Sequence, residues 1–472
     1  MAQALADGAV EELQADFDGE VILPEDSTYD EACRVFNSMI DRRPAVIARC
    51  ASADDVVATV NLARESDLEV AVRSGGHSVA GLSICSNGIL IDLAGLKEVD
   101  IDPNAGIART GGGVLWGEFD KATQEHGLHT PGGRVTTTGV GGFTTGGGYG
   151  WTSSKHGLTC DNLVSAEVVT ADGRLLNVSE EENEDLFWAI RGGGGNFGVV
   201  TRFDFDLHQL GPIVLAGLAL WPLERASEIL RAWRDYVDGA PDELSTACVI
   251  LTAPPEEFVP EHMRGQPVLG MAAMYVGDPE EGAPVVQPLK ELGPEVDLIG
   301  PMPYTEFQAI LDPSAPPGYR NYWRGEYLSG LSDKAIDTFV EHAPVTTATA
   351  PPFSQMIIFR LGGGVSAIDD DATAFSHRDA DYMFHPISVW EDPADDERVI
   401  AANREFAAAM RPFGTGAVYL NFTREEDRVR DAYGDEKYRR LVALKDKYDP
   451  RNLFRGNQNI QPSPKAGAAA TA

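Results

Sequence analysis

A short loop at residues 73–78, with the sequence Arg-Ser-Gly-Gly-His-Ser, carries the residue types best suited to chemistry in this chain. Its two adjacent glycines lack a Cβ, so the backbone can turn tightly and come close to another molecule. Successive N–H groups in such a loop can point at one anion, as in phosphate-binding nests. His77 follows the glycines, and no Cys or second His stands at metal-ligand spacing from it. We therefore expect His77 to face a phosphate-bearing cofactor and not a metal ion.

Two further glycine-rich segments follow, at residues 131–150 and 191–198. Neither ends in the Gly-Lys-Ser/Thr sequence of a P-loop, and residues 146–150 do not follow a strand in a Rossmann-type βαβ unit. The common nucleotide-binding folds therefore fit poorly. One glycine cluster alone would be explained by a structural turn, whereas three clusters predict backbone that surrounds an extended ligand.

The elements around these loops predict two domains, since 472 residues are too many for one simple core. Before Gly211, strands such as 68–72 alternate with helices, which predicts an α/β or α+β domain. A helix is expected at residues 52–65 with Ser52 as its N-cap, and another at residues 28–37. After Pro212 the order becomes strand, helix, strand, strand, helix. This order favours a second domain with an antiparallel sheet and helices on one face.

The chain carries 73 acidic and 38 basic residues, a formal net charge of −35. Such a charge repels nucleic acids and anionic membranes, so neither is expected as a partner. The acidic residues are dispersed and few of the basic residues are Lys. This is the surface expected in very high salt, where the Debye length is about 3 Å at 1 M. A salt-loving host is our hypothesis; a merely acidic mesophilic protein is the alternative.

The remaining composition favours a cytoplasmic protein. No run of about 20 apolar residues and no secretory signal are present in the sequence. The five cysteines are scattered without close pairs, which argues against a zinc site or a disulfide framework and fits a reducing compartment. We expect no metal site.

Taken together, the motifs resemble those of the VAO/PCMH flavoproteins and, within them, the berberine-bridge-enzyme-like (BBE-like) FAD-linked oxidases. The resemblance extends from about residue 42 to residue 462. It rests on these segments: 73–77, 138–142, 146–150, 156–162, 185–194, 196–198, 419–422, 448–454 and 457–458.

This resemblance implies an α+β fold in which an FAD-binding domain is joined to a substrate domain built on an antiparallel sheet. The expected parts are an N-terminal helical segment (1–41), an FAD-binding PCMH-type domain (42–211), a substrate-binding domain (212–415), a BBE-like segment returning to the FAD domain (416–462) and a disordered tail (463–472).

The resemblance also implies how the cofactor is held. Residues 73–78 would wrap the FAD pyrophosphate, and the His77 imidazole would be bonded to the flavin 8α-methyl carbon. Many relatives add a bond from a Cys, but Val135 stands at that position and cannot form a thioether. A single covalent link is therefore predicted. The full set of expected FAD contacts is Arg73, Ser74, Gly75, Gly76, His77, Ser78, Thr138, Gly139, Gly141, Gly142, Gly146, Gly147, Gly148, Tyr149, Gly150, His156, Gly157, Asp161, Asn162, Gly198, Val199, Val200, Asn421 and Asn457.

The catalytic base is less clearly indicated. Some carbohydrate-oxidising relatives use a Tyr where this chain has Phe422, which has no titratable group. The candidates are Tyr419, Tyr149, His385 and Tyr322, with Tyr419 ranked first because it is next to the motif. For the remaining histidines, which include His129 and His208, solvated or core positions are expected.

The implied function is that of an FAD-dependent oxidase, which moves hydride from an alcohol, sugar or amine C–H to flavin N5 and is reoxidised by O2 to give H2O2. Thr138 stands where relatives place a Val or Leu beside the flavin, and its small size favours access of O2. One alternative is a dehydrogenase that uses another electron acceptor. A second is a catalytically silent flavin-binding module. The partners expected are a small-molecule substrate and an electron acceptor.

Overall fold

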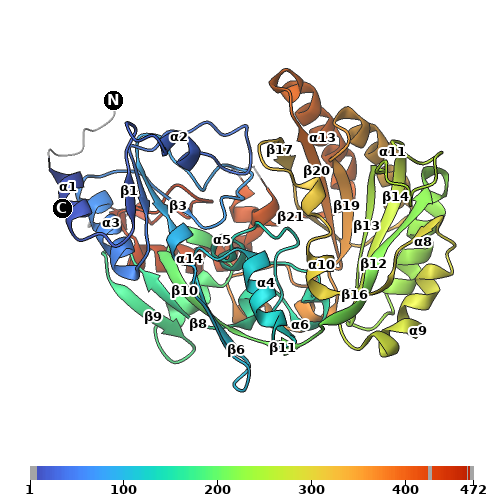
Figure 1. Cartoon of the computed structure of the whole chain (residues 1–472), viewed down its shortest axis with the longest axis horizontal. Coiled ribbons are helices and arrows are strands. Elements are labelled where there is room, and N and C mark those ends of the chain that lie inside the picture. The colour runs from blue at the N-terminus through green and yellow to red at the C-terminus, as the bar shows by residue number, and fades with distance from the viewer. Residues whose placement is uncertain (1–7, 424–427, 465, 468–472) are drawn as a thin grey trace.

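The structure is a computed structural model that describes residues 8–423, 428–464 and 466–467. Figure 1 shows two domains side by side: the first, predicted to bind FAD and called the FAD-binding domain, at the left, and the second, predicted to bind the substrate and called the substrate domain, at the right. The helix α14 (Gly434–Tyr448) lies in the first domain together with α1 (Ala9–Ala15), so the chain returns to this domain after the second one. No helix within the described ranges is long and apolar enough to cross a membrane.

The FAD-binding domain contains two sheets. The first has the order β1-β2-β4-β3, and its three strands β2, β4 and β3 run parallel. The second is a five-stranded antiparallel sheet of order β5-β6-β10-β8-β9. The strands are β1 (Glu20–Ile22), β2 (Val46–Arg49), β3 (Val70–Arg73), β4 (Ile89–Asp92), β5 (Val99–Asp102), β6 (Ile107–Gly111), β8 (Leu163–Val169), β9 (Leu175–Ser179) and β10 (Val199–Asp206).

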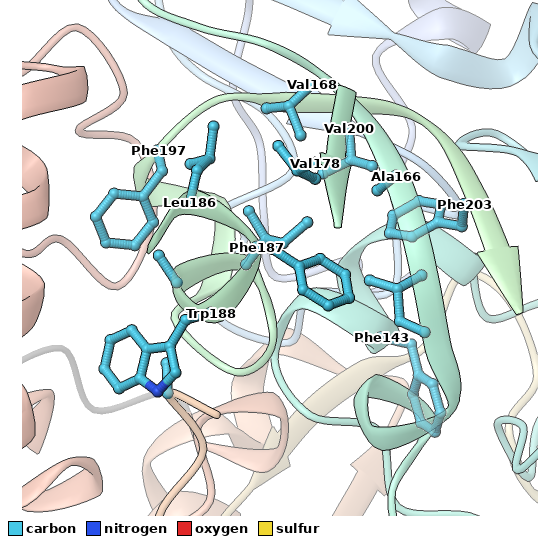
Figure 2. Packing of buried hydrophobic residues seen from close by; sticks show 14 of the residues in the cluster. Phe143, Ala166, Val168, Val178, Leu186, Phe187, Trp188, Phe197, Val200 and Phe203 are labelled. Atoms are coloured by element: carbon cyan, nitrogen blue, oxygen red, sulfur yellow. The ribbon is translucent and has the colours of Figure 1, made fainter. Parts of the chain in front are cut away.

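Helices and short pairings complete this domain: α1 (Ala9–Ala15), α2 (Tyr29–Ala32), α3 (Ala53–Glu65), α4 (Trp116–Gln124), β7 (Leu128–His129), α5 (Val140–Thr145), α6 (Ser153–His156), α7 (Glu184–Ile190) and β11 (His208–Gln209). Ser52 caps α3 as predicted, because its side chain accepts the Asp55 N–H. Figure 2 shows the core, in which Leu186 and Phe187 of α7 pack against Val168 of β8 and Val200 of β10.

The substrate domain is built on a 10-stranded sheet whose main path is β15-β12-β14-β13-β19-β20-β18-β21. All its pairings are antiparallel. The strands are β12 (Ile213–Pro222), β13 (Leu244–Thr252), β14 (Pro267–Tyr275), β15 (Val296–Asp297), β16 (Gly300–Pro303), β17 (Arg320–Trp323), β18 (Glu326–Leu328), β19 (Gln355–Arg360), β20 (Tyr382–Trp390) and β21 (Gly414–Val418).

Its long helices lie on the sheet face that points away from the FAD-binding domain (Figure 1). They bury an apolar stripe against the strands, as amphipathic helices do. The opposite face of the sheet is covered by the glycine-rich segment of the first domain. The long helices are α8 (Ala226–Val237), α9 (Pro279–Lys290), α11 (Asp333–Thr349) and α13 (Asp396–Met410). The short helices α10 (Tyr304–Gln308) and α12 (Gly363–Ser366) pack on the opposite face of the sheet, with the glycine-rich segment.

The predicted two-domain α+β architecture is confirmed, while some local predictions differ. Of the helix expected at residues 28–37, only Tyr29–Ala32 is helical. Asn37 instead donates from its side chain to the Val79 and Asn321 carbonyls, which holds this segment against both domains. The predicted tail 463–472 lies largely outside the described residues.

Candidate active site

A cavity of about 290 Å³ opens between the two domains. All three glycine-rich segments of the first domain line it, and strands β19 and β20 of the substrate domain face them across it. The predicted FAD contacts that line the cavity are Ser74, Gly75, Gly76, His77, Ser78, Thr138, Gly139, Gly141, Gly142, Gly146, Tyr149, Gly198, Val199, Val200, Asn421 and Asn457.

The other predicted contacts lie outside the cavity lining. Arg73 donates to Asp92 at 2.7 Å and to the Ala32 carbonyl, so it ties the loop to the sheet. Asp161 is paired with Arg378 of the substrate domain. Asn162 donates to the carbonyl of His156. The remaining members of this group are Gly147, Gly148, Gly150, His156 and Gly157.

The glycines fall into two functional kinds. A Cβ on Gly139 would lie 2.1 Å from the Gly75 nitrogen, so these two loops touch only because neither residue has a side chain. A Cβ on Gly142 or Gly195 would meet nothing within 4 Å, although both glycines line the cavity. Their missing side chains leave cavity volume free for a ligand.

The cavity also presents polar atoms that no protein group satisfies. Ser83 and Asn457 line the cavity. Ser83 Oγ and Asn457 Oδ1 are both buried without a hydrogen-bond partner among the described residues. Buried polar atoms are nearly always paired in native proteins, so these atoms point to a polar ligand. An elongated dinucleotide such as FAD fits this glycine cradle and its orphaned polar atoms.

His77 lines the cavity and is held rigidly. Its ring stacks on Phe36 at 4.2 Å between centroids, and its Nε2 lies 2.7 Å from Thr137 Oγ1. Within the described chain, Nδ1 has no hydrogen-bond partner. Burial lowers the pKa of His77 to about 4, so the ring is neutral at pH 7. In the neutral tautomer whose Nε2 donates to Thr137 Oγ1, Nδ1 carries the lone pair that a covalent bond requires.

Val135 and Thr138 also line the cavity. The apolar Val135 side chain, at the position where the resemblance would place a linking Cys, forms part of the cavity wall. Cys160, the nearest thiol in sequence, is buried elsewhere with its Sγ 3.7 Å from Asp161 Oδ1. Burial raises its pKa well above the usual range, which makes it a poor nucleophile.

His385, on β20, faces the cavity from the substrate sheet. Its Nδ1 lies 2.6 Å from the Arg324 carbonyl oxygen, which can only accept, so Nδ1 carries the proton and Nε2 carries the lone pair. Burial is the main cause that lowers the pKa of His385, to about 3, so the imidazole is neutral. Phe422 stacks on the ring at 4.0 Å with an interplanar angle of 14°. Phe422, at the position where the resemblance would place a Tyr base, thus packs against a histidine.

The tyrosine candidates are placed less favourably. The Tyr419 hydroxyl accepts from Gly148 N and Asn421 Nδ2, both at 3.0 Å, and its side chain does not line the cavity. Burial raises its pKa to about 12. Tyr149 lines the cavity, but its hydroxyl donates to the Arg360 carbonyl at 2.7 Å. Tyr322 is buried outside the cavity lining and accepts from Arg404.

Two features escaped the sequence reading. Arg134, next to Val135, lies buried in the cavity wall. His156 and His208 stack at 3.9 Å, and His129 lies 5.2 Å from His156, although these residues are remote in sequence. His129 is buried and the other two rings are half-buried, and no group of His, Cys, Asp or Glu that could hold a metal occurs among the described residues. The pairing of β7 with β11 places His208 opposite His129, and α6 brings His156 beside them.

The fold and the cavity define a two-domain flavoprotein, and comparison with known proteins gives its family. The chain matches the family model described as "FAD binding domain" over residues 44–179 and the model "Berberine and berberine like" over residues 418–461. It is 31% identical to an FAD-linked oxidoreductase of Dictyostelium discoideum, with 90% of this chain and 91% of that protein covered. It is also 31% identical to (R)-6-hydroxynicotine oxidase of Paenarthrobacter nicotinovorans, covering 94% and 97% of the two chains.

The crystal structure of 6-hydroxy-D-nicotine oxidase from Arthrobacter nicotinovorans is similar in fold, with a TM-score of 0.84, 29% identity, and 95% and 99% of the two chains covered. The chain therefore belongs to the berberine-bridge-enzyme-like family and is an FAD-dependent oxidoreductase. This confirms the predicted family, cofactor and enzyme class.

Proposed function

We propose that this enzyme is an oxidase that holds FAD through one covalent bond to His77 and uses His385 as the proton acceptor. The observation that carries the proposal is the pair of neutral imidazoles that face one cavity from opposite domains, each with one free ring nitrogen. Val135 in the cavity wall supports a single link. The FAD, when bound, would accept hydride from the substrate C–H and pass the electrons to O2, which yields H2O2.

The protein groups would then perform the proton chemistry. An O–H or N–H next to the oxidised carbon loses its proton to His385 Nε2, whose lone pair is available because the ring stays neutral above about pH 4. The Arg324 carbonyl and Phe422 fix the tautomer and the plane of that ring. Asn421 is held by its donation to the Phe143 carbonyl and to Tyr419. In this arrangement Tyr419 is a positioning residue.

The cofactor link is tested by acid denaturation. In the wild type the yellow flavin should precipitate with the protein, and in His77→Ala it should be released into the supernatant. Release of flavin from the wild-type protein would disprove the covalent link.

The role of His385 is tested by anaerobic reduction with an alcohol, sugar or amine that bleaches the wild-type flavin. His385→Gln should retain covalent flavin but bleach at least about 100-fold more slowly, the contribution typical of a general base. An unchanged rate in His385→Gln would exclude it as the base. If no substrate of these classes bleaches the wild-type flavin, a catalytically silent flavin-binding module is favoured.

O2 as the acceptor is supported by Thr138, a small side chain in the cavity wall, and by the oxidase name of the hydroxynicotine-oxidising relative. The yield of H2O2 per substrate oxidised distinguishes the oxidase from a dehydrogenase that uses another acceptor. A yield near one supports the oxidase, whereas slow reoxidation by O2 with fast turnover on an artificial acceptor supports the dehydrogenase.

We also propose that the enzyme works in the cytoplasm of a salt-adapted host. The net charge of −35 and the dispersed acidic residues support the high-salt environment, and the five free thiols support the reducing compartment. The melting temperature should rise between dilute buffer and molar salt. Full stability in dilute buffer would contradict the adaptation.

A further inference from the structure

Arg134 is the only cavity-lining residue whose side chain carries a permanent positive charge, among those that the structure describes. Its side chain is 7% exposed. The guanidinium carbon lies 4.3 Å from the centroid of the Tyr149 ring, 4.5 Å from that of Trp151 and 4.2 Å from that of Phe359. The three rings orient the guanidinium by cation–π contact.

The charge of Arg134 has no anionic partner in the described part of the chain. Nη2 donates to the Gly150 carbonyl at 3.2 Å, and Nε is buried without a partner. Elsewhere in the structure, buried arginines are paired with carboxylates, as Arg378 is with Asp161. An arginine cannot lose its proton in a protein, so a buried unpaired guanidinium is costly. Such a group at a cavity wall is suited to bind an anion that enters the cavity.

The surroundings restrict what that anion can be. Phe359, which contacts Arg134, lines the substrate-sheet side of the cavity together with Ile357, Ile387, Trp323 and Leu311. His385 lies on the same side, near enough that the Arg134 charge contributes to lowering its pKa. This wall offers few partners for the many hydroxyls of a sugar. It fits a flat or branched apolar group that carries one acidic function.

We propose that Arg134 binds the acidic group of the substrate, and that the substrate is an apolar or aromatic monoanion with an oxidisable C–H next to an O–H or N–H. This inference rests on the proposed oxidase function. Among the alcohols, sugars and amines that the family membership leaves open, it selects apolar or aromatic substrates that carry one acidic group. It also makes Arg134 a residue that determines substrate specificity.

Benzoate and its neutral isostere benzamide test the assignment. Each is titrated into the wild-type holoenzyme in the same salt buffer, with calorimetry and the visible flavin spectrum as readouts. Benzoate should bind at least about tenfold more tightly than benzamide, since loss of a buried charge pair costs more than a tenfold change in affinity. Equal affinities would overturn the assignment.

Variants separate a role toward the substrate from other roles. In Arg134→Met the preference for benzoate should disappear, in Arg134→Lys it should survive in part, and retained covalent flavin shows that each variant is folded. Arg440→Met, which removes an exposed arginine stacked 3.7 Å from the centroid of the Trp188 ring, is the matched control and should keep the full preference. If Arg134→Met lowers the midpoint potential of the flavin but keeps the benzoate preference, the anion bound by Arg134 belongs to the flavin and the assignment is wrong.

Failure of the proposed function is distinguishable from failure of this inference. Calorimetry reports benzoate binding whether or not the flavin is bonded to His77. A flavin released by acid would therefore overturn only the covalent link, while a missing preference for benzoate would overturn only the role of Arg134.

Discussion

The ion pair between Asp161 and Arg378 connects the two domains and offers the sharpest test of how the cavity walls are held together. Arg378 Nη2 donates to Asp161 Oδ1 at 2.5 Å and Nη1 to Oδ2 at 2.9 Å, a bidentate geometry. Both side chains are 2% exposed. Although burial acts to lower the pKa of Arg378, the hydrogen bond and charge of Asp161 raise it overall. We predict that Asp161→Asn strongly destabilises the protein.

The magnitude follows from the burial of both partners. Removing one charge from a buried ion pair typically costs about 3–5 kcal/mol, because the other charge is left uncompensated. The entropy of unfolding is about 2.1 cal/mol/K per residue, or about 1 kcal/mol/K for the 472 residues. The melting temperature of Asp161→Asn should therefore fall by about 3–5 °C if the chain unfolds as one unit.

The assay is a thermal melt followed by tryptophan fluorescence, with two matched variants. Asp172→Asn breaks an ion pair with Arg174 whose side chains are 52% and 62% exposed, and it should cost less than about 1 kcal/mol. The double variant Asp161→Asn/Arg378→Met removes both charges and should recover most of the loss. If the melting temperatures of Asp161→Asn and Asp172→Asn agree to within about 1 °C, the Asp161–Arg378 pair does not stabilise the interface between the domains. That result would refute our reasoning.

The same variant tests the predicted cofactor role of Asp161. Because Asp161 lies outside the cavity lining, Asp161→Asn should retain its full complement of covalent flavin at a temperature below its melt. Loss of flavin from the folded variant would instead support a direct contact with the cofactor.

Three further predictions concern the cavity and the histidine cluster. Val135→Cys should form a second covalent bond to the flavin, detected as a thioether-linked flavopeptide by mass spectrometry; an unmodified thiol would contradict it. Gly142→Val should fold but incorporate less flavin because the new side chain enters the cavity, whereas Gly139→Val should prevent folding. Normal flavin content in Gly142→Val would show that the cofactor does not use the cavity volume beside Gly142. Burial, followed by the charges of His208 and Lys155, lowers the pKa of His156 to about 3, below the value of about 6.5 in the unfolded chain. The neutral form of His156 therefore stabilises the fold above pH 6.5, and this stability is lost as the pH falls. At pH 5.5 the loss of stability is up to about 1.4 kcal/mol. His156→Gln should therefore flatten the dependence of the melting temperature on pH, whereas His126→Gln, at an exposed position, should leave that dependence unchanged. An equal slope in the wild type and in His156→Gln would contradict this prediction.

The local chemistry of the site was predictable from the sequence where it depends on the backbone. Glycine pairs are required wherever two loops touch, as at Gly75 and Gly139, and this requirement is written directly in residue type. The strand and helix of β3 and α3 follow from apolar periodicity and from the Ser52 cap. For the same reason the loop around His77 could be identified as a cofactor cradle before any fold was known.

The sequence ranked Tyr419 first as the base, but the choice depends on which atoms are free in three dimensions. Tyr419 is next to the motif, yet its hydroxyl is occupied by Gly148 and Asn421. His385 stands far from the motif in sequence, and only the return of the chain after β21 places Phe422 against its ring. Sequence proximity is a poor guide to such contacts, since a sheet joins residues that are distant in the chain.

The sequence by itself determined the family, the FAD cofactor and the absence of a Cys at position 135, because these depend on residue identities at fixed spacing. The tertiary structure decided which nitrogen of His77 and of His385 is free, that Arg134 is buried without an anion, and that Asp161 joins two domains instead of lining the cavity. These properties arise from packing between separate segments of the chain, 60 residues apart for His77 and Thr137 and 217 residues apart for Asp161 and Arg378, and no local pattern encodes them.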